Sequence, residues 1–250
     1  MPLKNILAKV KSLEPLSRDI ERLAEADKQE LEKLGIDLKG LFHELEPEAL
    51  RIAEAYADFY VARYESEGKR LMRENPEKFK YLLKLKRYLP NGSLPEKRKQ
   101  EQFRMGLTQK AFELFLQQIQ VAYIPNDPAI DWREKFKYDF RIPLFGSIDI
   151  KSALFSYPTP LVNINMRDFE SEKPDFAVAY LILDTNQPRW LKLLGILKAS
   201  EIRGYEVVEG SRPYWSVPAS DFEKHDGNEL LRRLLIVKHE LEKLEKLSKG

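Results

Sequence analysis

The 250-residue sequence contains no cysteine and only three histidines. Without cysteine the chain can form no disulfide, has no thiolate nucleophile and offers zinc no sulfur ligand. The histidines, His43, His225 and His239, lie far apart in the sequence, so histidine-based metal binding is not indicated. Any metal is therefore expected to be a hard cation held by oxygen atoms, which favours Mg2+ (or Mn2+) on carboxylates.

The sequence also lacks a long apolar run. None approaches the roughly 18 residues that a membrane span requires, and the first five residues are not followed by the apolar stretch and cleavage site of a secretion signal. We therefore expect a cytoplasmic protein. Its 43% hydrophobic and 33% charged residues are typical of a soluble globular chain, and the charged fraction suggests adaptation to heat.

Several catalytic motifs are missing. The sequence has no G-x-S-x-G, no G-x-x-x-x-G-K-[ST], no H-E-x-x-H and no dinucleotide-binding glycine fingerprint. These absences argue against a serine hydrolase of the nucleophile-elbow type, a P-loop NTPase, a helix-based zinc protease and a Rossmann dehydrogenase.

Charge is nearly balanced over the whole chain, with a net charge of +2, but not locally. Residues 78–104 carry nine basic and two acidic side chains, with Tyr81 and Tyr88 between them. Such a stretch is typical either of a surface that follows a DNA backbone or of a solvated linker. The candidate nucleic-acid contacts here are Lys84, Lys86, Arg87, Lys97, Arg98 and Lys99.

The first third of the chain reads as helical. Residues 46–74 form the longest periodic segment, with small and aromatic side chains on one face that we interpret as core packing. Leu-Pro-Asn-Gly-Ser at residues 89–93 predicts a turn, and the charged residues 95–99 read as a link. We therefore place a domain boundary after residue 92, with a helical domain for DNA binding or dimerisation at 1–92 and a second domain at 93–250.

In the second domain a predicted helix at residues 102–121 is followed by segments with the period of two that strands show. A short helix and a leucine-rich, amphipathic C-terminal helix complete the domain. We expect the latter to dock onto its own domain rather than form a free coiled coil, with a dimer seam as the alternative. The predicted strands are 137–142, 147–155, 161–166, 176–183, 190–197 and 214–217, and the two helices are 199–202 and 228–247.

Three charged residues lie unexpectedly in the apolar stretch 138–155. Side chains two apart on a strand share a face, so Asp149 and Lys151 project together. The connection at residues 143–146 is short enough for an antiparallel hairpin that brings Asp139 across from them. The three residues either lie on the wet edge of a sheet with an incidental ion pair or form a site.

If Asp139, Asp149 and Lys151 form a site, their side chains predict metal-assisted phosphodiester hydrolysis. A divalent cation bound to two neighbouring carboxylates offsets their electrostatic repulsion. It also lowers the pKa of a bound water and neutralises charge on a phosphate. Lys151 would orient or deprotonate that water and stabilise the transition state.

An acid, a short gap and D-x-K on the adjacent strand, with a helix before and strands after, resemble the PD-(D/E)xK nuclease superfamily, which includes restriction endonucleases and Holliday-junction resolvases. The resemblance implies an α/β, restriction-endonuclease-like core at about residues 102–222, with a mixed central sheet flanked by helices. Asp139 and Asp149 would be the acidic, metal-binding positions and Lys151 the lysine. An extra acid on the preceding helix would be Glu113, and Gln109 would stand where other members have Glu.

The sequence departs from the superfamily pattern in two respects. The residue before Asp139 is Tyr138 and not Pro, which the family tolerates. The literal Pro174-Asp175 follows the D-x-K instead of preceding it, so we interpret it as a strand start and Asp175 as a weak site candidate. Arg141, Asn163 and Asn165 are further candidates for nucleic-acid contacts, although a wet sheet face would show the same asparagine pattern.

The resemblance implies a magnesium-dependent DNA endonuclease of the restriction or mobile-element type. The alternative is a non-catalytic DNA-binding or assembly protein with a nuclease-like fold. DNA is the expected partner in both, and cleavage of both strands would favour a homodimer.

Overall fold

The computed structural model describes residues 47–125, 138–154, 160–182, 191–224 and 227–248. These residues belong to two compact units, which we call the helical unit (46–114) and the sheet unit (115–248). The helices predicted before residue 46 and the start of the strand predicted at 137–142 lie outside the described residues. No described helix is both long and apolar enough to cross a membrane.

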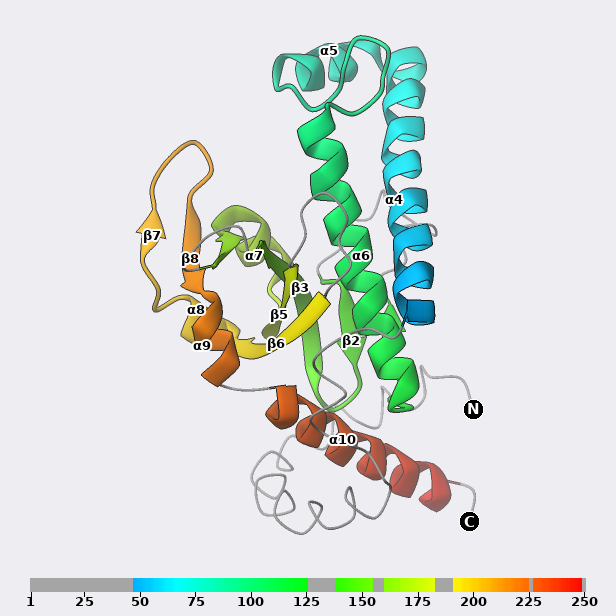
Figure 1. The fold of residues 1–250 in the computed structure, drawn as a ribbon, viewed down its shortest axis with the longest axis vertical. Helices are drawn as coiled ribbons and strands as arrows, with labels where there is room; N and C mark the ends of the chain where they lie inside the picture. Colours follow the sequence, from blue (N-terminus) through cyan, green and yellow to red (C-terminus); the bar gives the residue numbers. More distant parts are fainter. Residues whose placement is uncertain (1–46, 126–137, 155–159, 183–190, 225–226, 249–250) are drawn as a thin grey trace. The chain divides into compact units, whose positions relative to one another are not determined.

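The helical unit consists of α4 (Pro47–Glu74), α5 (Pro76–Lys84) and most of α6 (Glu96–Gln118). Helix α4 confirms the helix predicted at 46–74, and its small and aromatic stripe is buried as expected, with Ala53 and Ala57 fully buried. Helices α4 and α6 run side by side (Figure 1), and a Cβ on Gly106 of α6 would lie 3.0 Å from Cα of Ala57.

The turn predicted at residues 89–93 is present. The Leu89 amide donates to the Ser93 carbonyl at 2.7 Å, and Gly92 has a φ of 81°, which glycine adopts without strain. This turn lies directly against α4, because a Cβ on Gly68 would be 2.1 Å from the Gly92 carbonyl oxygen. Contact this close leaves room only for glycine at position 68.

The charged segment expected as a link is instead the first turn of α6. The carbonyl of Pro95 accepts hydrogen bonds from the amides of Arg98 and Lys99, at 2.8 and 3.0 Å, as the residue before a helix does. The structure also divides into its compact units after Leu114, inside α6, and not at the expected boundary after residue 92.

The sheet unit contains a five-stranded sheet with the strand order β1-β2-β3-β5-β6. Strands β3 and β5 are parallel and every other pair is antiparallel, so the sheet is mixed, as expected. The strands are β1 (Ile124–Pro125), β2 (Phe140–Ile142), β3 (Gly146–Leu154), β5 (Phe176–Ile182) and β6 (Leu191–Lys198). The last four confirm predicted strands, and the protein is α/β.

A smaller antiparallel sheet has the order β4-β8-β7, and Figure 1 labels its strands β7 and β8. Its strands are β4 (Leu161–Asn165), β7 (Val207–Val208) and β8 (Tyr214–Pro218). A shared apolar core joins it to the large sheet: Ala177 and Ala179 of β5 belong to the same buried cluster as Val162 of β4 and Trp215 of β8. The sequence predicted β4 and β8 as strands but not their separate sheet.

The residues that the structure describes in this unit also form the helices α7 (Met166–Glu172), α8 (Ala199–Ile202), α9 (Ala219–Lys224) and α10 (Gly227–Leu247). Helices α7 and α9 were not predicted. Helix α10 packs on its own unit, as expected: Leu230, Leu234 and Val237 are buried, and the Lys238 ammonium donates to the Ile119 carbonyl at 3.3 Å.

Candidate active site

The β2–β3 hairpin brings Asp139 beside the D-x-K segment. Its register pairs Phe140 with Ile148, and the Asp139 amide extends the ladder by donating to the Ile148 carbonyl at 2.9 Å. The Asp139 carboxylate accepts a hydrogen bond from the Ile150 amide at 2.7 Å. The predicted hairpin is therefore confirmed, and a half-buried carboxylate lies at its open end.

Asp149 and Lys151 lie on one face of β3 and form an ion pair, with Lys151 Nζ 2.5 Å from Asp149 Oδ2. Asp149 is 4% exposed, so it does not lie on a wet sheet edge. Its Oδ2 is buried and has no hydrogen bond of regular geometry, which leaves the lysine ammonium as its counter-charge. The neighbouring positions of β5 are Ala177 and Ala179, whose small side chains are typical beside a charged group that needs space.

Burial and mutual repulsion act on the acids of this group. Burial, and next the negative charge of Asp149, raise the pKa of Asp139 well above its usual range. Burial lowers the pKa of Lys151, but the charges of Asp149 and Asp139 outweigh this effect and raise it above its usual value. Lys151 is therefore a cation at neutral pH.

A third carboxylate, Glu172 at the end of α7, belongs to the same electrostatic group. Burial and the charge of Asp149 raise its pKa to about 7, and its charge acts in turn on Asp139 and Lys151. The sequence analysis missed it. Nothing local distinguishes Glu172 from Glu170, which instead pairs with Arg203 at 2.8 Å on the surface.

Asp175 has a structural role that accounts for its carboxylate. Its Oδ2 accepts hydrogen bonds from both the amide and the hydroxyl of Ser147, each at 2.8 Å, and its own amide donates to the Ser147 carbonyl. These bonds join the first residues of β3 to those of the parallel strand β5. A Cβ on Gly146, whose φ is 132°, would lie 2.7 Å from the same oxygen.

Glu113 and Gln109 lie on α6 within the helical unit, not in the unit that contains the D-x-K segment. Glu113 forms an ion pair with Lys110 at 2.7 Å, and this ammonium also lies 5.4 Å from the centre of the Tyr56 ring. Glu113 is therefore half-buried and engaged in an ion pair between residues three apart on α6.

The candidate nucleic-acid residues are divided between the two units. Lys84, Lys86 and Lys97 are exposed, while Lys99 pairs with Glu65 at 3.4 Å and Arg98 with Glu101 at 3.8 Å. Arg87 is half-buried, and these six residues all belong to the helical unit.

In the sheet unit, Arg141 and Asn163 are exposed on their strands. Asn165 has a local role, because its side chain accepts a hydrogen bond from the Asp168 amide at 3.0 Å and so caps the N-terminus of α7. Of the two asparagines predicted to share a strand face, Asn163 alone is exposed to solvent.

The oxygens of Asp139 and Asp149 suit a hard divalent cation, and the buried Asp149 Oδ2, which is balanced by the Lys151 ammonium and has no regular hydrogen bond, has the right chemistry for a ligand. Within the described residues no three His, Cys, Asp or Glu side chains converge as a metal site. Mg2+ does not need three, since it commonly binds one or two carboxylates and completes its shell with water and substrate phosphate. The residues therefore fit magnesium.

Comparisons with family profiles, with curated proteins and with solved structures found no match.

Proposed function

We propose that this protein is a metal-dependent DNA endonuclease that hydrolyses phosphodiester bonds. The observation that carries the proposal is the buried Asp149–Lys151 pair on β3 with the Asp139 carboxylate at the open end of the same hairpin. Removing charged side chains from water costs free energy, and an ion pair that only contributes to the surface avoids this cost by staying exposed. A buried acid with an adjacent lysine and a second acid is therefore favoured where the charges have a chemical use.

Asp139 and Asp149 would hold Mg2+ (or Mn2+), which when bound supplies an acidified water and charge neutralisation at the phosphate. The Lys151 ammonium would donate to a non-bridging phosphate oxygen and stabilise the negative charge of the transition state. The raised pKa of Lys151 supports this electrostatic role over proton abstraction, since it keeps the side chain protonated near neutral pH. Glu172 would add a third negative charge to the group around the lysine and hold it in place.

The experiment compares the wild type with Asp149→Asn and Lys151→Met on plasmid, single-stranded and branched DNA, with Mg2+, Mn2+ or EDTA. We expect cleavage by the wild type with metal and at least about 100-fold slower cleavage by both variants, because each loses a charge that acts on the transition state. Glu209→Gln removes an exposed carboxylate between β7 and β8 and serves as the matched control, which should cleave like the wild type.

A second candidate is a non-catalytic DNA-binding or assembly protein with a nuclease-like fold. It is favoured by the observation that the Lys151 ammonium already neutralises Asp149 at 2.5 Å, so the buried charge is compensated without a metal. It predicts DNA binding that persists in EDTA and no cleavage with any metal. If the wild type cleaves no DNA with any metal, the enzyme proposal is rejected. If Asp149→Asn and Lys151→Met cleave DNA as fast as the wild type, the site assignment is rejected.

A further inference from the structure

We propose that the exposed face of α4 is a self-association surface through which two copies of this chain pair antiparallel, about a two-fold axis near Phe59 and Ala62. The inference concerns the helical unit alone and does not depend on the proposed nuclease activity.

Helix α4 has an apolar line on its outer face as well as on its buried one. The outer line contains Ile52, Ala55, Phe59, Ala62 and Ser66, which follow one another at spacings of three and four residues and are all exposed. Ile52 is 41% and Phe59 54% exposed. A helix in contact with its own unit on one side needs only one apolar face, so this second line indicates a partner.

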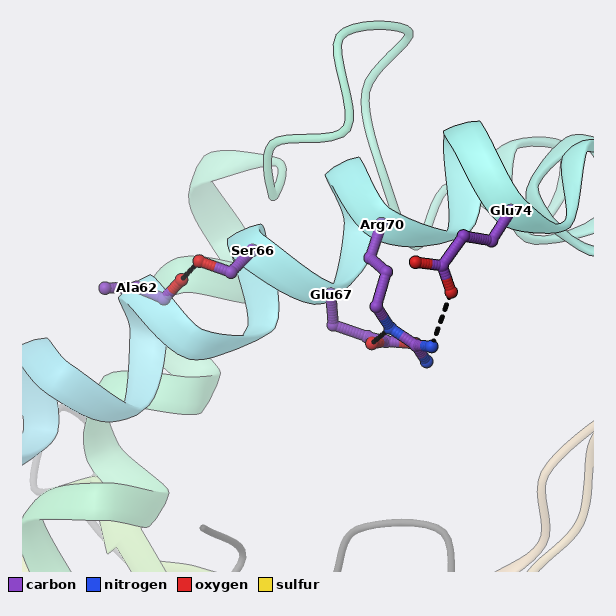
Figure 2. Close-up of polar contacts among 5 residues, drawn as sticks. All are labelled: Ala62, Ser66, Glu67, Arg70 and Glu74. Atoms are coloured by element: carbon purple, nitrogen blue, oxygen red, sulfur yellow. Dashed lines mark hydrogen bonds and ion pairs between the residues drawn. The ribbon is translucent and has the colours of Figure 1, made fainter.

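The hydroxyl of Ser66, the polar side chain on this line, does not need a hydrogen bond to water. Ser66 Oγ donates a hydrogen bond to the carbonyl oxygen of Ala62 at 2.9 Å, one turn earlier in the same helix (Figure 2). Because its donor is satisfied within α4, Ser66 can be covered without leaving an unpaired polar group. The outer line can therefore be buried along its whole length.

The sizes of the side chains on the line favour pairing with itself. A two-fold axis perpendicular to the helix at its middle places Phe59 of one copy on Ala62 of the other, and the same contact is repeated on the other side of the axis. The line's two alanines and Ser66 let two helix backbones approach closely, while Phe59 supplies the large group that fills the space between them.

The charges at the two ends of the line determine the direction of pairing. Glu48 lies at its N-terminal end and Lys69 and Arg73 at its C-terminal end, all of them exposed. Among the described residues no carboxylate forms an ion pair with Lys69 or Arg73, whereas Glu48 contacts only its neighbour Arg51 on the surface. Antiparallel helices bring opposite charges together at both ends and also oppose their macrodipoles, whereas parallel helices align like charges.

In a parallel pair, charged side chains that flank the line would have to form the ion pairs between the two copies. One of these side chains, Arg70, already forms ion pairs within its own helix. Arg70 is held by Glu67 at 2.7 Å and by Glu74 at 2.8 Å within the same helix (Figure 2). A parallel partner would have to compete with both contacts, so the antiparallel arrangement is favoured.

Sedimentation velocity of the full chain over a wide concentration range tests the association. One helix per copy gives a small contact compared with the roughly 800 Å2 per partner of standard interfaces, so a concentration-dependent dimer is expected. Phe59→Asp should raise its Kd by about tenfold or more, since it removes the central apolar contact. Tyr81→Asp, which changes a 62% exposed aromatic on α5, is the matched control and should leave the Kd unchanged.

Disulfide cross-linking tests the direction, and the absence of native cysteine makes it free of background. In an antiparallel pair, Glu48→Cys mixed with Arg73→Cys should form a covalent heterodimer, whereas Glu48→Cys alone should not. In a dimer of Glu48→Cys alone, the two introduced thiols would be separated by most of the length of the helix, about 40 Å for 28 residues, beyond disulfide reach.

A chain that stays monomeric at all concentrations would overturn the proposal, as would a Tyr81→Asp variant that dissociates as readily as Phe59→Asp. Efficient cross-linking of Glu48→Cys with itself would overturn the antiparallel arrangement. Circular dichroism of Phe59→Asp should match that of the wild type, because the residue is exposed and its replacement opens no cavity.

Discussion

Two acids of the proposed site are compensated by specific contacts. Asp149 is paired with Lys151, and Asp139 accepts a backbone hydrogen bond from Ile150. Glu172 is the exception, because burial and the charge of Asp149 outweigh the attraction of Lys151 and raise its pKa to about 7. The proposed site therefore contains more negative than positive charge when all its acids are ionised.

The raised pKa of Glu172 predicts a pH-dependent stability. A carboxyl whose pKa is higher in the folded than in the unfolded chain stabilises the fold while it is protonated. This stabilising contribution is fully present below the usual pKa of 4.5 and is lost as the pH rises through 7, because the folded chain then has to ionise a buried group. We expect the free energy of unfolding of the wild type to fall between pH 4.5 and 8 relative to that of Glu172→Gln. Urea denaturation in EDTA at several pH values measures this difference.

The control for that experiment is Glu209→Gln, which replaces an exposed carboxylate in the same unit. Its stability should follow the wild-type pH profile throughout. A constant difference between Glu172→Gln and the wild type at all pH values would contradict the assignment, since a titrating group must change its contribution across its pKa.

Helix α4 is packed against the 89–93 turn so closely that one position accepts only glycine. A Cβ at Gly68 would lie 2.1 Å from the Gly92 carbonyl oxygen and 2.5 Å from the Tyr88 ring. Alanine in a helix interior usually stabilises by up to about 1 kcal/mol over glycine. Here we expect Gly68→Ala to lower the free energy of unfolding by about 1–3 kcal/mol, because backbone and a buried ring must move.

Chemical denaturation measures this effect, and Gly210→Ala is its control, because a Cβ at Gly210 would meet no atom within 4 Å. A Gly68→Ala protein as stable as the wild type would mean that the turn does not rest on α4 as described.

Helix α6 illustrates why a charged segment is difficult to assign from sequence. Residues 95–99 have the charge density of a linker, but Glu, Lys, Arg and Gln are also strong helix formers, and Glu96 at the first turn suits the helix dipole. Helix α7 was missed for the opposite reason: seven residues are too few to establish a helical period.

At the scale of the complete molecule, the basic stretch belongs to the helical unit and the proposed acidic site to the sheet unit. DNA binding and DNA cleavage should therefore respond to different substitutions. Replacing Asp149 should abolish cleavage without abolishing binding, whereas replacing lysines of the helical unit should weaken the binding of all DNA sequences alike.

We expect the triple variant Lys84→Ala, Lys86→Ala, Lys97→Ala to bind DNA more weakly and with a smaller salt dependence. The slope of log K against log salt concentration should become less negative by about 0.9 for each phosphate contact that is lost. Fluorescence anisotropy over a range of salt concentrations measures this slope. Replacing the exposed lysines Lys173 and Lys246 together should leave it unchanged, and an unchanged slope in the triple variant would remove the basic stretch from the proposed interface.

Local pattern was sufficient for most elements. The spans of α4, β3, β5, β6 and α10 were predicted within one or two residues, because the periods of 3.6 and 2 are imposed by each element's own burial. Strand parity also placed Asp149 and Lys151 on one face, and the short connection at residues 143–146 predicted the hairpin that brings Asp139 to them.

Contacts between distant segments could not be obtained in this way. The parallel pairing of β3 with β5, the separate β4-β8-β7 sheet and the presence of Glu172 rather than Glu170 near Lys151 all depend on how the elements pack. The same holds for Glu113, which is equally acidic in the sequence but pairs with Lys110 in the other unit. Periodicity records which side of an element is buried, whereas only the folded chain determines what covers that side.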